Sequence, residues 1–216
     1  MSYKAVLFDM DGTLLNTLED LANAGNQTLK KLGFPIHNIE DYRFFVGKGA
    51  ASLAKVILPT EKQDESTVQT CLEMFLNEYD KHWMDNTKLY PGISQMLDQL
   101  TEMGIRMSIF SNKPHPLTMK CANAFLSKWN FEKIYGQSAE TPRKPDPKGA
   151  LKIAEEMNLP TESFAYLGDT STDMKTANAA KMFPVGVLWG FRPKEELIEA
   201  GSKALLENPL ELFKFI

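Results

Sequence analysis

Short runs of apolar residues recur along the chain, and segments with helical spacing separate them. Four runs have the length and the flanks of buried parallel strands: residues 5–8, 105–110, 164–167 and 183–188. A fifth, shorter strand is expected near residues 133–136. The alternation of strands with helices predicts an α/β sheet whose crossover connections are right-handed.

The helical segments support the same fold class. Over residues 93–103 apolar side chains recur at the i, i+3, i+4 and i+7 spacing of a helix, and Gly104 provides the stop signal. Further helices are expected over residues 116–128, 147–158 and 172–181.

One long segment breaks the alternation. From about residue 18 to residue 83 there is no convincing strand, and helices are expected over 21–32, 38–45, 50–57 and 68–83. A structureless crossover of that length is disfavoured, so an inserted all-helical cap domain is the better explanation. We therefore expect a Rossmann-like parallel sheet core from residues 1–16 and 87–216, and a helical cap from residues 17–86.

Composition adds several exclusions. The 216 residues are 43% hydrophobic and 24% charged, with a net charge of -4 and no block of basic residues, which argues against nucleic-acid and membrane-surface partners. No apolar stretch approaches the roughly 20 residues that span a bilayer. The N-terminus starts a strand with no room for a signal peptide, and Cys71 and Cys121 lack CxxC partners. A cytoplasmic protein with free thiols is expected.

The first candidate site follows the first apolar run, as Asp9-Met10-Asp11-Gly12-Thr13. Two carboxylates one residue apart suit Mg²⁺, which prefers oxygen ligands. An aspartate can also attack phosphorus while a second acid protonates the leaving group. Gly12 allows close backbone approach, and Thr13 offers a hydroxyl to a phosphate. An acidic turn is the alternative, because Asp-Gly is a common turn dipeptide.

Other strands also end on chemically useful side chains. Ser111 and Asn112 follow the second run, and Asp169 and Asp173 follow the run at residues 164–167. Ligands of open α/β sheets bind beyond the carboxyl ends of the strands, so these side chains are expected at one edge of the sheet.

Lys144 lies in a loop, residues 142–147, whose prolines would fix its position. Carboxylates, a metal ion, a hydroxyl and a fixed lysine together make a phosphoryl-transfer site. Each residue alone also has a plain structural interpretation: Ser111, Asp169 or Asp173 as a helix cap, and Lys144 as a solvated charge. Their arrival at the same edge favours the functional interpretation.

These motifs resemble those of the haloacid dehalogenase-like (HAD-like) phosphatases, over nearly the whole chain. Their DxDGT motif matches residues 9–13, their second-strand Ser/Thr matches Ser111, their lysine matches Lys144, and their GDxxxD matches residues 168–173. The resemblance implies a HAD-like core, a helical C1-type cap and Mg²⁺-dependent hydrolysis through an aspartyl-phosphate.

The resemblance also implies roles for the carboxylates. Asp9 would be the nucleophile and a Mg²⁺ ligand. Asp11 would be the general acid/base and would also give its backbone carbonyl to the metal. Asp169 would be a direct metal ligand, and Asp173 a supporting carboxylate beside the metal site.

The remaining roles concern the phosphoryl group. Ser111 would hydrogen-bond its oxygens, helped by backbone N–H groups near Asn112, and Thr13 would assist in substrate binding. Lys144 would balance the negative charge of the nucleophile and the phosphoryl group.

Within that superfamily, residues 45–49, 89–92 and 186–192 resemble the phosphoglycolate phosphatases most. This makes 2-phosphoglycolate the first expected substrate, and a small phosphorylated metabolite the expected partner. An inorganic pyrophosphatase, a broad sugar-phosphate phosphatase, a phosphonate hydrolase, a phosphomutase and a catalytically silent binding module stay open, as do monomer and homodimer. Lys181 departs from the pattern, which usually has glycine there.

Lys48, between two glycines, is a further candidate for substrate binding. It could reach from the cap into the closed site and pair with a substrate carboxylate or a second phosphate. A solvated lysine in a turn is the alternative. We expect a surface role for Arg43 and a structural role for Arg192.

Overall fold

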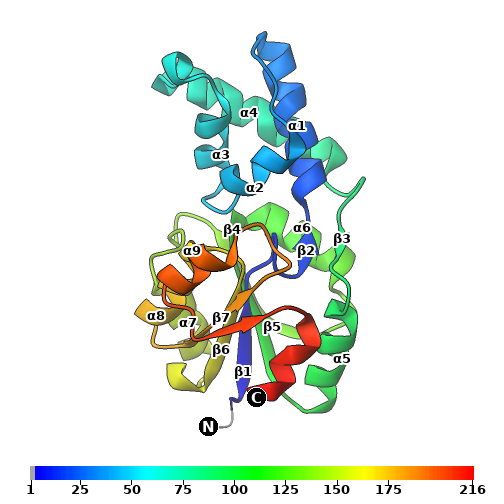
Figure 1. Ribbon diagram of the computed structural model, residues 1–216, viewed down its shortest axis with the longest axis vertical. Coiled ribbons are helices and arrows are strands. Elements are labelled where there is room, and N and C mark those ends of the chain that lie inside the picture. The colour runs from blue at the N-terminus through cyan, green and yellow to red at the C-terminus, as the bar shows by residue number, and fades with distance from the viewer. Residues whose placement is uncertain (1–2) are drawn as a thin grey trace.

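The computed structural model describes residues 3–216 and contains a six-stranded parallel sheet (Figure 1). The strand order is β5-β4-β1-β6-β7-β8. The strands are β1 (Ala5–Phe8), β4 (Arg106–Pro114), β5 (Phe131–Gln137), β6 (Phe164–Gly168), β7 (Phe183–Val187) and β8 (Ala204–Leu206). The sheet and its flanking helices confirm the predicted α/β fold class.

Helices cover both faces of the sheet because the strands bury side chains on both faces. Val6 and Phe8 of β1 pack in one cluster with apolar residues of α5 (Ile93–Glu102) and α6 (His115–Phe125). The alternate residues, Ala5 and Leu7, pack with α7 (Lys148–Glu156) and α8 (Ser171–Ala179). Beside them lies the short helix α9 (Lys194–Glu199).

Two details of the sheet differ from the expectation. The edge strand β8 was not predicted, because three residues are too short to show a period. Strand β4 runs on to Pro114, well past the apolar run that predicted it, and α6 begins only at His115. Ser111 therefore lies inside a strand, which rules out its interpretation as a helix cap.

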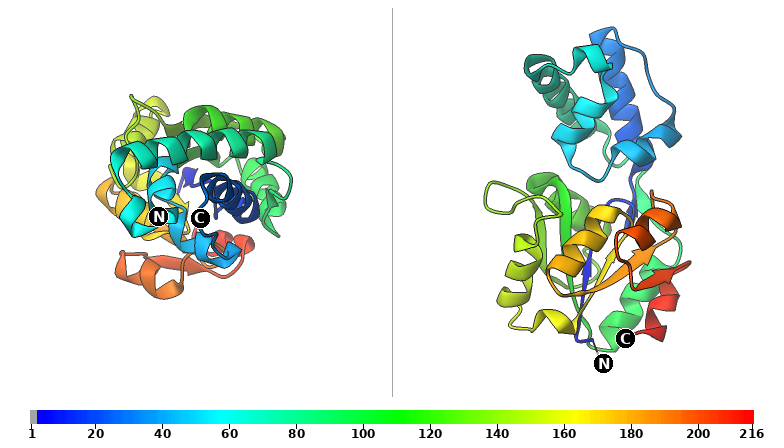
Figure 2. Two further views of the ribbon diagram at one scale, coloured as in Figure 1. Left: turned by 90° about the horizontal axis from the view of Figure 1, so that it is seen from above. Right: turned by 60° about the vertical axis from the view of Figure 1, so that its left-hand side comes forward.

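Four helices lie beyond the carboxyl ends of the strands (Figures 1 and 2). They are α1 (Leu18–Leu32), α2 (Tyr42–Phe45), α3 (Ala50–Ile57) and α4 (Glu65–His82), with short 3₁₀ turns at Ile39–Asp41 and Thr60–Lys62. Buried residues such as Leu29, Leu53 and Phe75 form their shared interior. Within residues 3–216, no helix is both long and apolar enough to span a membrane.

The chain passes between the helices and the sheet through a narrow two-stranded ribbon. Strands β2 (Leu15–Asn16) and β3 (Lys88–Leu89) pair antiparallel, so the outgoing and returning segments lie side by side. Asp20, 1% exposed, fastens this neck. Its carboxylate accepts hydrogen bonds of 2.7–3.1 Å from the backbone N–H groups and side chains of Asn86 and Thr87.

Lys181 adopts a left-handed backbone conformation, with φ of 58°. It follows α8, and its N–H donates to the carbonyl of Asn178 at 3.1 Å. Glycine takes this conformation without the penalty that a Cβ atom brings. The departure from glycine at this position therefore leaves the turn intact.

Replacing Asp20 with alanine is expected to destabilise the protein by about 2 kcal/mol, because several donors lose a charged acceptor. Urea unfolding followed by circular dichroism measures the change. Asp85→Ala is the matched control, since that side chain is 55% exposed and, within residues 3–216, bonds only to His82. Equal stability of the two variants would contradict the role assigned to Asp20.

Candidate active site

A cavity lies between the carboxyl end of the sheet and the helices above it. Its polar wall comes from the ends of β1 and β4, and its apolar wall comes from α1, α3, α4 and the loop before α3. The lining includes Asp9, Asp11, Ser111, Asn112 and Lys113 on the polar side, and Leu21, Val46, Leu53, Phe75 and Tyr79 on the apolar side.

Asp9 stands at the floor of this cavity, directly after β1, and is 6% exposed. Lys144 Nζ lies 2.7 Å from Asp9 Oδ1 and 2.7 Å from Asp173 Oδ1. Burial raises the pKa of Asp9 to about 7, although the Lys144 ammonium opposes that rise. One ammonium therefore holds two carboxylates in place.

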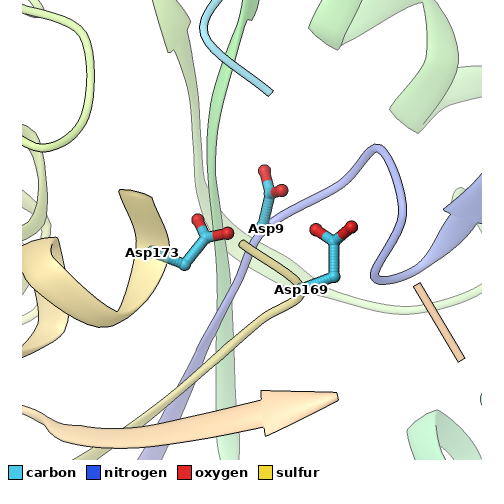
Figure 3. Close-up of side chains that lie close together, drawn as sticks. All are labelled: Asp9, Asp169 and Asp173. Atoms are coloured by element: carbon cyan, nitrogen blue, oxygen red, sulfur yellow. The ribbon is translucent and has the colours of Figure 1, made fainter. Parts of the chain in front are cut away.

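Asp9, Asp169 and Asp173 form the acidic cluster shown in Figure 3. One oxygen from each carboxylate lies within 4.8 Å of the other two. Burial and the negative charges of Asp9 and Asp173 raise the pKa of Asp169 well above its usual range. A cluster of carboxylate oxygens fits a hard divalent cation, which would relieve this repulsion.

Asp169 is placed by contacts from two sides. Its Oδ2 accepts a hydrogen bond of 2.8 Å from the N–H of Phe191, and its Oδ1 accepts one of 3.4 Å from the Thr13 hydroxyl. A Cβ atom on Gly12 or on Gly190 would clash with Asp169. Gly12 also has φ of 89°, so this position needs glycine for both conformation and space.

Asp173 has two roles at once. It is the third residue of α8 and forms a capping box with Thr170, whose hydroxyl donates to Asp173 Oδ2 at 2.6 Å. Its other oxygen accepts from Lys144 Nζ. The helix-cap interpretation is thus correct, and it coexists with membership of the acidic cluster.

Lys144 is 5% exposed, so its interpretation as a solvated charge is wrong. Asn112 positions the loop that carries it. Asn112 Oδ1 accepts from the N–H of Lys144 at 2.7 Å, and Asn112 Nδ2 donates to the carbonyls of Lys144 and Gly47 at 3.2 and 3.0 Å. The Asn112 side chain therefore joins the lysine loop to the segment above the cavity.

Ser111 and Thr13 lie on different sides of Asp9. Ser111 lines the cavity, and its hydroxyl accepts a hydrogen bond from the Lys113 N–H at 3.2 Å. Thr13 is fully buried and is not among the cavity residues, because its hydroxyl faces Asp169. The structure thus places Ser111 on the cavity wall and Thr13 behind the acidic cluster.

Lys113 is a site residue that the sequence reasoning missed. Its Nζ lies 3.0 Å from each oxygen of Asp11 and 2.9 Å from the hydroxyl of Tyr79 on α4. Residues two apart in a strand share a face. Ser111 and Lys113 therefore both face the cavity, and extending the strand period beyond the apolar run would have identified the lysine.

Lys48 is not brought to this cavity. Its side chain is exposed and borders a separate surface hollow with Thr170 and Glu196. The expectation of a surface role for Arg43 misses its bonds to the carbonyls of Gly190 and Phe191 at 2.6 and 3.3 Å.

Arg192, for which a structural role was expected, is buried and does bridge the two parts of the chain. One Nη atom donates to the carbonyls of Phe44 and Val46 at 3.0 and 2.8 Å.

Comparisons with known proteins find similar sequences over most of the chain. The family model described as "Haloacid dehalogenase-like hydrolase" matches residues 6–187. A phosphoglycolate phosphatase from Pseudomonas putida is 31% identical over 96% of this chain and 77% of its own length. Another from Nitrosospira multiformis is 28% identical over 99% of this chain and 95% of its own.

Among solved structures, a haloacid dehalogenase-like family hydrolase from Streptococcus pneumoniae shares the fold. Its TM-score is 0.89 at 23% identity, over 99% of this chain and 98% of that one.

Asp169→Asn is expected to raise the melting temperature of the metal-free protein at pH 8. The raised pKa means that the folded state holds its proton more tightly than the unfolded state, so stability falls as pH rises above about 4. The amide of the Asp169→Asn variant carries no charge, so the variant does not lose this stability at high pH. Saturating Mg²⁺ should raise the melting temperature of the parent protein and have a much smaller effect on the variant.

The control is Asp80→Asn, because that carboxylate is 61% exposed. An Asp169→Asn variant that melts lower than the parent in EDTA, at every pH from 5 to 8, would show that Asp169 is not under electrostatic strain.

Proposed function

We propose that this chain, which belongs to the haloacid dehalogenase-like hydrolases and is a phosphoric monoester hydrolase, uses Mg²⁺ and acts on 2-phosphoglycolate. The observation that carries the proposal is the environment of Asp9. A buried carboxylate sits at the floor of a cavity, 2.7 Å from a buried ammonium and beside two further carboxylates. The names of the relatives support the choice of substrate.

The first step is attack of Asp9 on phosphorus. A bond forms between a carboxylate oxygen and phosphorus, and the bond from phosphorus to the leaving oxygen breaks. Lys144 offsets negative charge at this point, and the Ser111 hydroxyl donates to a phosphoryl oxygen. Asp11, in its protonated form, gives its proton to the leaving oxygen, so that glycolate leaves as an alcohol.

The second step restores the enzyme. Asp11, now a carboxylate, takes a proton from a water molecule that attacks the aspartyl-phosphate. The bond between phosphorus and the Asp9 oxygen breaks, and inorganic phosphate leaves. Asp11 thus regains from water the proton that it gave to the leaving oxygen, and Asp9 is again a free carboxylate.

Phosphatases of this family generally use a divalent metal, and Mg²⁺ fits the oxygen-only donor set here. We assign Asp9, Asp169 and the backbone carbonyl of Asp11 as its ligands, with Asp173 supporting them. The bound ion would neutralise charge on the phosphoryl oxygens. In that arrangement Lys144 would keep its ion pairs with Asp9 and Asp173.

The helices above the sheet would act as the cap, with boundaries at residues 17–86 and a core of residues 1–16 and 87–216. Their apolar side chains, Val46, Leu53 and Phe75 among them, line the cavity opposite Asp9. Such a wall excludes water from the aspartyl-phosphate until the leaving group has gone. Asn112 and Arg192 fasten the segment from Phe44 to Gly47 to the core.

A panel of phosphate esters tests the substrate, with phosphate release measured in Mg²⁺ and Asp9→Asn as the blank. We expect 2-phosphoglycolate to have the highest kcat/KM, above pyrophosphate, sugar phosphates, nucleotides and phosphonoacetaldehyde. The blank should be inactive but folded, because the amide cannot attack phosphorus. A higher kcat/KM for another panel member would replace the substrate, and activity in the blank would remove Asp9 as the nucleophile.

Removal of the metal is expected to abolish turnover. Treatment with EDTA should reduce phosphate release to the level of the blank, and excess Mg²⁺ should restore it, because the three carboxylates repel the substrate when no cation is present. Sodium chloride at matched ionic strength is the control. Full activity in EDTA would contradict the metal assignment.

A further inference from the structure

The cavity has one cationic side chain on its wall. Of its lining residues, all of which belong to the described part of the chain, only Lys113 is a lysine or an arginine. The other buried lysine, Lys144, is already held by Asp9, Asp173 and the carbonyl of Phe110. A substrate with a second negative group would therefore meet Lys113.

The position of Lys113 matches the far end of a short substrate. Phosphorus lies at Asp9 in the proposed reaction, and the leaving oxygen faces Asp11. The group attached to that oxygen must then lie beyond Asp11, where Lys113 Nζ is 3.0 Å from the Asp11 carboxylate. In 2-phosphoglycolate the carboxylate is one methylene beyond the leaving oxygen, which brings it next to this ammonium.

Tyr79 reaches Lys113 from the opposite side of the cavity. Its hydroxyl lies 2.9 Å from Lys113 Nζ. Its ring stacks on Phe75, with centroids 5.9 Å apart and planes at 13°. The hydroxyl is thus held in place by the interior of the helices, and it can donate to an anion that Lys113 attracts.

We propose that Lys113 and the Tyr79 hydroxyl bind the carboxylate of the substrate and select carboxylated over uncharged leaving groups. This inference rests on the proposed function. Without substrate, Asp11 pairs with Lys113. When the substrate binds, Asp11 takes up a proton from solvent and turns to the leaving oxygen, and the substrate carboxylate takes its place beside the ammonium.

The selectivity follows from the cost of an unpaired buried charge. An uncharged leaving group would leave the Lys113 ammonium, 3% exposed, without its partner once Asp11 moves. A site built to pair with a polar group discriminates strongly against an analogue that lacks it. A surface lysine does not provide this discrimination, because water replaces the missing partner, and Lys48 is in that situation.

The test compares 2-phosphoglycolate with 2-hydroxyethyl phosphate, which has a leaving group of the same length and no charge. The ratio of their kcat/KM values measures the preference for a carboxylate. Lys113→Met should reduce that ratio about 30-fold or more, since it removes one partner of a buried charge pair. Tyr79→Phe should reduce the ratio by a smaller factor. This variant also tests the Lys113–Tyr79 pair if Lys113→Met does not fold.

Lys120→Met is the matched control. This lysine lies on α6, is 41% exposed and pairs with Asp80, so the ratio should equal that of the parent. Loss of activity on both substrates by the same factor in Lys113→Met and Tyr79→Phe would overturn the inference, because the two residues would then serve only to orient Asp11. A ratio that falls in Lys48→Met but not in Lys113→Met would also overturn it and move carboxylate binding to Lys48.

Failure of the proposed substrate gives a different result. In that case the parent protein itself would show no preference for 2-phosphoglycolate, which removes both the substrate and the inference. A clear preference in the parent that survives Lys113→Met removes the inference alone.

Discussion

Excess negative charge in a buried place is the constraint on which the catalytic end of the sheet depends. Asp9, Asp169 and Asp173 crowd together, and among the described side chains Lys144 is the cation that touches two of them. Like charges in a low-dielectric setting repel strongly, so such a cluster persists only with rigid support. That support comes from the Asn112 bonds to the lysine loop and from the start of α8. In the proposed function the same imbalance attracts a divalent cation, and the bound cation would in turn attract the phosphoryl group.

Backbone carbonyls, rather than apolar contact alone, fasten the helices above the site. The carbonyls of the segment from Phe44 to Lys48 accept hydrogen bonds from Asn112, Arg143 and Arg192 of the sheet domain. In return, Arg43 donates to carbonyls near Gly190. Contacts of this kind depend little on which side chains the segment carries. They can therefore fix its position while leaving its cavity-facing residues free to vary.

Much of this arrangement could be predicted because parallel strands end at the same edge. Each apolar run indicated a strand, and the residues after β1 and β6 had to converge. Strands β2, β3 and β8 were not predicted, because two or three residues are too few to show the alternating pattern of a strand. Hydrogen bonds between residues distant in sequence, such as Arg43 and Gly190, were also not predicted, because no local sequence pattern encodes a contact across 147 positions. The flanking glycines of Lys48 indicated a turn but not the direction in which its side chain points.

The neck formed by β2 and β3 has a consequence for the history of such proteins. The chain leaves the sheet and returns to it through two adjacent segments, joined by two residue pairs, Leu15 with Leu89 and Asn16 with Lys88. A different segment could be inserted between these two strands without moving Asp9 or Asp169. Loop closure would cost little more for a longer insert, because that cost grows only logarithmically with length. Evolution can thus exchange the helices above the site while inheriting the sheet and its acidic cluster unchanged.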